Sequence, residues 1–405
     1  MTEVAPKRER RPHVLFVQAA DAACYPPIIH AASLMAEAGW RVSVLSAPIA
    51  GTGLEFSRHS GIDLYLTAPR PSHVMTRGAY VAYAAAASLL AIRKRPDLVY
   101  VSDPLGAGPG LLASGLTNAR LVYHEHDTPT PGALSPFPAR LRRAAACRAA
   151  AVIFPNEARA RIAQAELGLS DDRLHIVWNM PRRAELPVRE AKPDGKLLLY
   201  YHGNISPVLL PETVIEAVRQ FAGRVRLLIA GYEAPGAAGH IRRLLRCCRS
   251  GPEAPVRYLG PIPRSDLLGV AAQAHVGLAV VPADAEDLNI RYLTGASNKA
   301  FDYMAAGLAL LVSDLPDWRA MFAAPGYARS CNPADLASIK AALGWFIDHP
   351  EARRDMGARG RARIAADWNY DTAFRRVIAS VIEAPEIKDD GVMQTNDRTP
   401  AGGVG

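Results

Sequence analysis

Charged and aromatic side chains gather in the segment Asn289–Trp318, which reads NIRYLTGASNKAFDYMAAGLALLVSDLPDW. The pattern predicts a short helix over Asn298–Ala306. A carboxylate such as Asp302 on the first turn of this helix can accept hydrogen bonds from the two adjacent hydroxyls of a ribose. The helix N–H groups and the charge of Lys299 favour phosphate. The segment therefore predicts a nucleotide site, with Asn298 beside it, unless Asp302 only complements the helix dipole and Lys299 is a solvated lysine.

A second polar cluster ends the run Arg120–Asp127, which reads RLVYHEHD. The run predicts a strand, and His124, His126 and Asp127 follow one another at its carboxyl end. A histidine there can hydrogen-bond a substrate hydroxyl, and Asp127 could orient it, although a structural or loop-capping role is the alternative. Two further carboxylates that follow strands are weaker candidates because both could cap helices: Asp21 and Asp103.

Short β-rich runs alternate along the chain with longer segments of helical periodicity, beginning with the strand His13–Gln18 and the helix Pro27–Ala38. Such alternation is typical of parallel sheets with helices on both faces. The pattern restarts at Lys196, after the charged, proline-containing stretch Arg182–Gly195. We therefore predict an α/β fold of two Rossmann-like, doubly wound domains that face a cleft, over residues 13–180 and 196–369, between a flexible start (1–12) and a disordered tail (384–405).

The composition is that of a globular protein of 405 residues with a formal net charge of +8. Basic residues are spread along the chain, so we expect no nucleic-acid partner. The five cysteines form no CxxC pair and lack histidines at metal-ligand spacing, which favours a reducing cytoplasm and predicts neither metal nor disulfide. No signal peptide or membrane span is expected. The arginine-rich stretch Arg140–Arg161 could contact an anionic membrane, or could simply be a solvated helix.

The segment around Asp302 resembles the donor-binding signature of GT-B glycosyltransferases of family 4 (glycosyl transferases group 1), a version of P-x-K-x-x-E-Y-M-A-x-G-x-P-V-I-x-S. Asp302 occupies the usual glutamate position. The other matching residues are Lys299, Phe301, Tyr303, Met304, Ala305, Ala306 and Gly307. The resemblance implies that the second domain binds a nucleotide-sugar donor and the first binds the acceptor. It also implies that a last helix, 370–383, crosses back to the first domain.

Other stretches carry the same resemblance. The sequence around Gly203 and Asn204 is similar to the family's glycine loop beside the donor phosphates, and Tyr232 is at a position where it could stack on the nucleobase. The first-domain run around His126 and Asp127 resembles the family's V-Y-D-x-H-D/E segment.

The chain departs from the family pattern at three positions near the expected donor phosphates. Asn204 and Leu209 stand where members often carry Arg and Lys, and Thr294 replaces the usual acid eight positions before Asp302. We expect Arg291 to supply part of the missing positive charge, although it could also be a solvated arginine.

The resemblance implies transfer of a sugar from a nucleoside-diphosphate donor to a hydroxyl acceptor, with retention and with no metal or cofactor. The acceptor could be a glycan, a lipid-linked sugar or a small molecule. Two alternatives remain open: a nucleotide-sugar epimerase on the same fold, and a non-catalytic binding or scaffold protein of glycan assembly. A dehydrogenase is disfavoured, because the motif Gly108-x-Gly110 does not follow the first strand.

Overall fold

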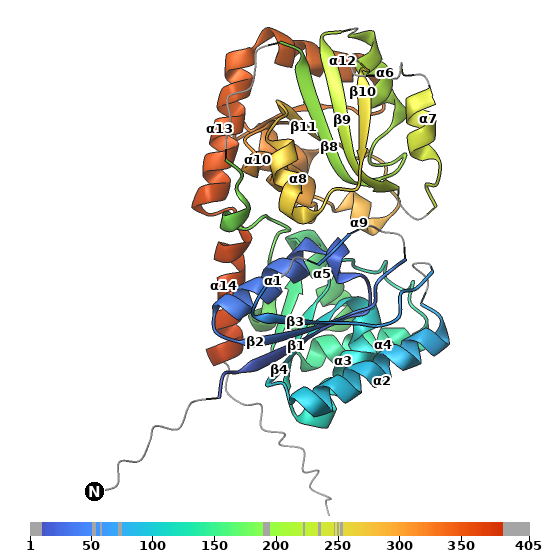
Figure 1. The fold of residues 1–405 in the computed structure, drawn as a ribbon, viewed down its shortest axis with the longest axis vertical. Coiled ribbons are helices and arrows are strands. Elements are labelled where there is room, and N and C mark those ends of the chain that lie inside the picture. The colour runs from blue at the N-terminus through green and yellow to red at the C-terminus, as the bar shows by residue number, and fades with distance from the viewer. Residues whose placement is uncertain are drawn as a thin grey trace, which may run out of the picture.

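A computed structural model describes residues 10–50, 54–56, 59–71, 75–188, 195–221, 223–233, 236–246, 248, 251 and 254–383. Most of the predicted flexible start, residues 1–9, and all of the predicted tail, 384–405, lie outside the described residues. Two α/β domains, each built on a parallel sheet, follow one another along the chain (Figure 1). This arrangement confirms the predicted fold class.

The first domain has a seven-stranded sheet in the order β3-β2-β1-β4-β5-β6-β7. Its strands are short and mostly buried on both faces, as expected where helices cover a parallel sheet. The strands are β1 (His13–Gln18), β2 (Arg41–Ser46), β3 (Ile62–Leu66), β4 (Leu98–Ser102), β5 (Arg120–His124), β6 (Ala151–Phe154) and β7 (Leu174–Ile176).

Figure 1 shows α1 on one face of this sheet, with α2 and α3 side by side on the other. The connecting helices are α1 (Pro26–Glu37), α2 (Arg77–Lys94), α3 (Asp103–Thr117), α4 (Pro136–Arg148) and α5 (Glu157–Leu167), with short 3-10 turns η1 (Ala22–Cys24), η2 (Asp171–Arg173) and η3 (Arg183–Glu185). Two separate apolar clusters fill the two faces of the sheet.

The second domain has a six-stranded sheet in the order β10-β9-β8-β11-β12-β13. Its strands are β8 (Leu197–Ile205), β9 (Val225–Glu233), β10 (Val256–Gly260), β11 (Val276–Ala279), β12 (Ala309–Ser313) and β13 (Ala328–Cys331). Its helical segments are α6 (Glu212–Gln220), α7 (His240–Arg246), α8 (Arg264–Ala271), α9 (Leu288–Arg291), α10 (Asn298–Ala305), α11 (Pro316–Trp318), η4 (Arg319–Ala323), α12 (Leu336–Asp348) and α13 (Pro350–Ala366).

The last helix, α14 (Tyr370–Glu383), belongs to the core of the first domain. Its apolar residues Tyr370, Phe374, Val377 and Val381 are buried beside α1 and the strands of the first sheet. The chain therefore passes twice between the domains, once through η3 and once before α14. Among the described residues, no helix combines the length and the apolar character that crossing a bilayer requires.

Candidate active site at the domain junction

The carboxyl end of β8 holds the first part of the expected donor site. Gly203 has a φ of +99°, in the left-handed region that favours glycine. The sequence predicts a loop here, but β8 pairs with β9 as far as Ile205, so Gly203 and Asn204 lie within the strand. At Gly231 of β9, a Cβ atom would overlap the Gly203 carbonyl oxygen, so the glycine allows β9 to stay close to β8 and the pairing to continue. Two glycines side by side thus allow the two strand ends to approach closely.

Lys299, the second residue of α10, reaches back over this strand end. A Cβ placed on Gly203 would lie 3.6 Å from Lys299 Cε and 3.7 Å from its Nζ, and the ammonium sits 5.4 Å from the centre of the Tyr201 ring. Lys299 is half-buried, and burial lowers its pKa to about 8. No carboxylate of the described residues forms an ion pair with it. Lys299 is therefore a partly buried cation above a glycine at a strand end. This arrangement is suited to binding an anion, and it differs from the solvated surface lysine of the alternative interpretation.

Asp302 is in a different environment from the one its sequence position predicts. Because α10 begins at Asn298, Asp302 is the fifth helical residue, and the first turn contains no acid. Its side chain is fully buried, and its two oxygens accept hydrogen bonds from Arg264 at 2.6 and 2.8 Å. His202 Nε2 lies 3.2 Å from the same carboxylate. In this conformation a ribose cannot reach Asp302, so binding there requires Arg264 to move.

Arg264 also joins the second domain to the first. Its guanidinium donates to Glu185 of η3 at 2.7 and 3.1 Å, and Glu185 lies 2.9 Å from His30 Nε2 in α1. Burial opposes ionisation of Glu185, but His30 and Arg264 outweigh it and hold the pKa of that carboxyl far below its usual value. A largely buried chain of polar contacts therefore runs from α10 through the linker to α1.

In the first domain, the two predicted histidines lie against each other at the end of β5. Their ring centroids are 3.8 Å apart, and the Tyr100 hydroxyl is 2.6 Å from His124 Nδ1. Burial, helped by the Arg159 guanidinium, lowers the pKa of His126 to about 3. Within the described residues, both ring nitrogens of His126 and Nε2 of His124 have no hydrogen-bond partner. His126 is thus a neutral imidazole that can still donate and accept a hydrogen bond.

Asp103 connects β4 to this cluster. Its φ of +60° is unusual for a residue with a Cβ, and its carboxylate accepts from the backbone N–H groups of His126 (2.7 Å) and Asp127 (3.2 Å). Burial and the Asp127 carboxylate raise the pKa of Asp103 well above its usual value. Asp103 therefore fixes the loop that carries the predicted site residues and is more than a helix cap.

The other two carboxylates have simpler surroundings. Asp21 accepts from the Ala23 N–H at 3.1 Å and so caps η1, as the alternative interpretation of its position predicts. The Asp127 side chain is 66% exposed, with its carboxylate 4.0 Å from the Arg159 guanidinium.

A continuous set of contacts connects the donor side to the acceptor side. The Tyr232 side chain, at the end of β9, lies beside Cys24 of η1, whose thiol adds to burial in raising the pKa of the phenol. The ring of the next residue, Tyr25, lies 5.5 Å from that of His126. On the other side, Tyr232 is close enough to Tyr201 to help burial raise the pKa of that phenol. The structure thereby brings Tyr232 and His126, from different domains, into one neighbourhood.

The segment before α10 is held against the first domain by α5. Asn156 caps α5 and also donates to the carbonyls of Tyr292 (2.8 Å) and Thr294 (2.9 Å). Arg159, which is 1% exposed, donates to the carbonyls of His126 (2.7 Å) and Asn289 (2.6 Å). Asn156 and Arg159 therefore hold the segment that contains Thr294, the position where the family pattern has an acidic residue.

Arg291, the last residue of α9, is exposed, and its Nε donates to the Ala285 carbonyl at 3.0 Å. Its remaining guanidinium donors have no partner among the described residues. Asn298 and Asn204 each keep a buried side-chain atom without a hydrogen bond to the described residues, Nδ2 and Oδ1 respectively.

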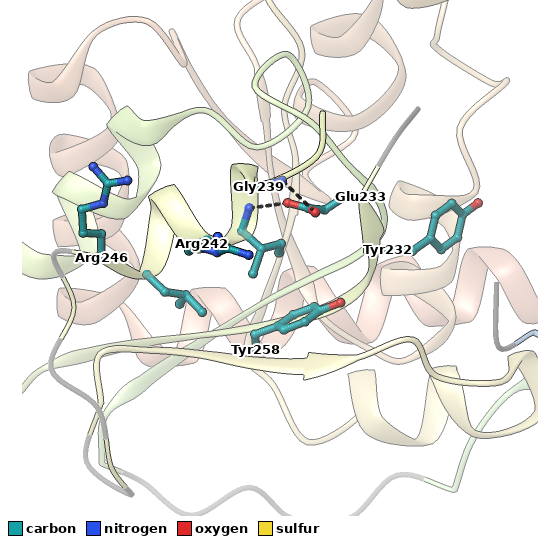
Figure 2. A pocket seen from close by; sticks show the side chains of 8 residues that line it. Tyr232, Glu233, Gly239, Arg242, Arg246 and Tyr258 are labelled. Atoms are coloured by element: carbon teal, nitrogen blue, oxygen red, sulfur yellow. Dashed lines mark hydrogen bonds between the residues drawn. The ribbon is translucent and has the colours of Figure 1, made fainter. Parts of the chain in front are cut away.

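A pocket of about 640 Å³ borders Tyr232 but lies outside this neighbourhood (Figure 2). It is lined by Glu233, Arg242, Arg246 and Tyr258, and the Glu233 carboxylate accepts from the backbone of Gly239 and Ile241 at the start of α7. The Tyr232 ring points away from Arg242 and Arg246 in Figure 2. Tyr232 therefore faces the domain junction.

Four residues of the site were not predicted from the sequence. Gln18 ends β1 with a buried Oε1 that has no hydrogen-bond partner among the described residues, and Tyr25, Arg159 and Arg264 make the contacts described above. The sequence contained a signal for Gln18, which is a polar residue at the end of an otherwise apolar strand. It contained no such signal for Arg159 or Arg264. Among the described residues, no group of three or more His, Cys, Asp or Glu side chains is placed to hold a metal ion.

Two family models match the chain. A glycosyl transferase 4-like domain matches residues 28–179, and a glycosyl transferase-like domain matches residues 212–379. No curated protein sequence matches.

Solved structures share the fold at low identity. Sucrose-phosphate synthase from Thermosynechococcus elongatus is 16% identical over 92% of this chain and 100% of its own, with a TM-score of 0.65. The trehalose-6-phosphate protein from E. coli bound with UDP-2-fluoro glucose is 15% identical over 92% and 99%, with a TM-score of 0.67. A UDP-N-acetylglucosamine 2-epimerase is 13% identical over 91% and 95%, with a TM-score of 0.57.

Because an epimerase shares the architecture, the fold alone does not separate the reactions. The matches to the two family models identify the family, since one falls in each domain and both describe glycosyl transferases. The chain belongs to the GT-B glycosyltransferases of family 4 (glycosyl transferases group 1).

Proposed function

We propose that the chain transfers a hexose-like sugar from a nucleoside-diphosphate donor to a hydroxyl acceptor, with retention at the anomeric carbon. The observation that carries the proposal is Lys299, a desolvated cation packed over Gly203. A diphosphate placed there would receive the ammonium charge in a poorly hydrated environment, where electrostatic interactions are stronger than in water. The E. coli trehalose-6-phosphate protein, which binds UDP-2-fluoro glucose, supports the choice of a nucleotide-linked donor.

In the transfer, the bond between the anomeric carbon and the diphosphate oxygen breaks and the acceptor oxygen bonds to that carbon. The proton of the acceptor hydroxyl passes to the leaving diphosphate. Negative charge grows on the leaving diphosphate, where Lys299, Arg291 and the backbone N–H groups at the start of α10 stabilise it. These groups perform a task for which other enzymes use a metal ion, so the proposed reaction requires neither a metal nor a cofactor.

The acceptor side supplies hydrogen bonds. His126 is neutral, because its pKa is about 3. Both of its ring nitrogens are buried, so they can hold a sugar hydroxyl once the contacts that cover them open. A weakly basic imidazole positions the sugar better than it removes a proton. We assign contact with the acceptor hydroxyl to the exposed carboxylate of Asp127, and we place the nucleobase near Tyr232, at the junction.

The test is calorimetric binding of UDP, GDP, ADP and dTDP to the wild-type protein and to Lys299→Met and Asp302→Asn. We expect one nucleotide to bind and Lys299→Met to weaken it at least tenfold. The matched control is Lys340→Met, a half-buried lysine of α12, which leaves binding unchanged. If no nucleotide binds, the donor site is absent and the chain is a non-catalytic member of the family.

Turnover then separates the two remaining activities. A transferase consumes the matching nucleotide-sugar only when an acceptor is present, apart from slow hydrolysis. An epimerase converts the donor alone, so isomerised donor in the absence of acceptor would reject the transfer reaction.

A further inference from the structure

The helices α2, α3 and α4 form one outer layer of the first domain, on the opposite face of the sheet from α1 (Figure 1). Adjacent helices of this layer pack against each other in the order α2, α3, α4. The layer is close to the acceptor side, because α3 begins at Asp103, whose carboxylate holds the backbone of His126.

Large apolar side chains are exposed over this layer. Seven of the eleven large hydrophobic residues that are exposed within the described part of the chain lie on its three helices, at exposures between 46% and 67%. They are Val81, Leu89, Ile92, Leu105, Leu112, Leu116 and Phe137. Single exposed apolar residues are ordinary, but a concentration of them on one layer marks a surface that contacts something else.

The spacing of these residues gives stripes along the helices. On α2, Val81, Ala85, Leu89 and Ile92 follow at intervals of four, four and three residues, so they share one face of the helix. On α4, Phe137, Arg140 and Arg148 share a face in the same way, at intervals of three and eight. Apolar residues and arginines therefore occur on the same exposed faces.

The charge of the layer is of one sign. The three helices contain a single acid, Asp103, which is engaged with the loop of His126. Five arginines of the layer are exposed and form no ion pair with any described residue: Arg77, Arg93, Arg140, Arg143 and Arg148. In the second domain, by contrast, several exposed arginines pair with nearby acids, among them Arg219 with Glu216 and Arg319 with Asp314.

We propose that the α2–α3–α4 layer docks on the surface of a lipid bilayer that contains anionic phospholipids. The five unpaired arginines can form ion pairs with lipid phosphates, and the apolar stripes between them can enter the boundary between headgroups and acyl chains. A purely electrostatic partner such as nucleic acid leaves the seven apolar residues without a role. The docked layer would bring the end of β5 close to an acceptor carried by the membrane.

The experiment is sedimentation of the full chain with phosphatidylcholine vesicles that contain no phosphatidylglycerol or 30% of it. We expect binding to the anionic vesicles that weakens between 50 and 500 mM NaCl. Each arginine near an anionic surface contributes roughly a fivefold change in partitioning, so Arg140→Ala/Arg148→Ala should lose roughly 25-fold. Leu89→Ser/Ile92→Ser should lose at least about tenfold by removing apolar burial.

The control pair is Arg219→Ala/Arg319→Ala, which removes two exposed arginines of the second domain and should leave vesicle binding unchanged. All six substitutions are at partly or fully exposed positions, and an unchanged unfolding midpoint verifies that each variant is folded. Vesicle binding needs no nucleotide, so its outcome is independent of the donor-binding test.

Three results would overturn the proposal. The first is a wild-type chain that does not sediment with anionic vesicles. The second is a control pair that weakens vesicle binding as much as the layer variants do. The third is a concentration-dependent dimer in sedimentation velocity that Leu89→Ser/Ile92→Ser dissociates, which would show that the layer pairs with a second copy of the chain.

Discussion

Replacing Arg264 by methionine tests the electrostatic account of its ion pairs with Asp302 and Glu185. Arg264 neutralises two carboxylates, Asp302, which has no exposed surface, and Glu185, whose side chain is 22% exposed. Methionine keeps much of the side-chain volume and removes the charge. Removing one partner of a buried ion pair costs about 3–5 kcal/mol, because the other charge stays buried. We expect a loss of that size in the free energy of unfolding, measured by urea denaturation at pH 8.

The pH dependence provides a sharper signature than the size of the loss. In the wild-type protein, burial alone would raise the pKa of Asp302, but Arg264 and His202 hold it below its ordinary value. Its contribution to stability is therefore present above that ordinary value, about 3.9, and lost as the pH falls through the lower folded-state value. Without Arg264, burial raises the pKa, so the variant loses stability as the pH rises through the raised value. The difference between the two proteins should thus be larger at pH 8 than at pH 5.

Two further variants complete the test. Arg264→Met/Asp302→Asn removes the uncompensated charge and should recover at least half of the loss. Arg219→Met breaks one exposed pair with Glu216 and should cost less than about 1 kcal/mol. A loss below 1 kcal/mol for Arg264→Met, or a loss that is the same at both pH values, would refute the reasoning.

Three other substitutions follow from the site. The pKa of Lys299 is about 8, and a bound diphosphate favours the ammonium form. Nucleotide affinity should therefore be constant below pH 8 and fall by up to tenfold per pH unit above it. The Lys299→Arg variant should abolish that fall in calorimetric titrations. The His126→Ala protein should fold and bind nucleotide, yet transfer sugar at least about tenfold more slowly. Because the pKa of His126 is about 3, the pH profile of the wild-type rate should show no ionisation of His126 between pH 5 and 9. Gly203→Ala should lower the free energy of unfolding by about 1–3 kcal/mol, because alanine is strained at this left-handed φ; denaturation measures the loss. The variant should also bind nucleotide more weakly, because the new methyl group lies against Lys299.

The fold could be predicted because its signals are local. Runs such as Val14–Val17 are apolar at every position, as strands of a covered parallel sheet must be, and each is followed by a helical stretch. The prediction was wrong in detail at β8, which extends past Gly203 to Ile205. A glycine usually indicates a turn, and only the adjacent Gly231 makes it compatible with a strand at this point.

The surroundings of the site could not be predicted in the same way. Lys299 and Asp302 were identifiable because they lie in one short motif, but Arg264 is 38 residues from Asp302 and resembled an ordinary first residue of a helix. Its pairing depends on how α8 packs against α10. The same holds for Arg159, whose partners His126 and Asn289 are 33 and 130 residues away. Contacts of this kind are set by the tertiary arrangement, which one sequence without its relatives does not display.

The strength of the contacts between the domains differs from place to place, and this difference bears on how a donor could enter. At the linker, Glu185 and Arg264 form a buried ion pair, and at α5 the buried Arg159 donates to carbonyls of both domains. Beside the expected nucleobase, Tyr232 of β9 lies next to Cys24 of η1. Such a contact is weak, whereas breaking a buried ion pair costs several kcal/mol. Separating the domains at Tyr232 while the contacts of Glu185 and Arg159 persist is therefore the least costly opening. It uncovers the end of β8, with Gly203, and the start of α10, with Lys299.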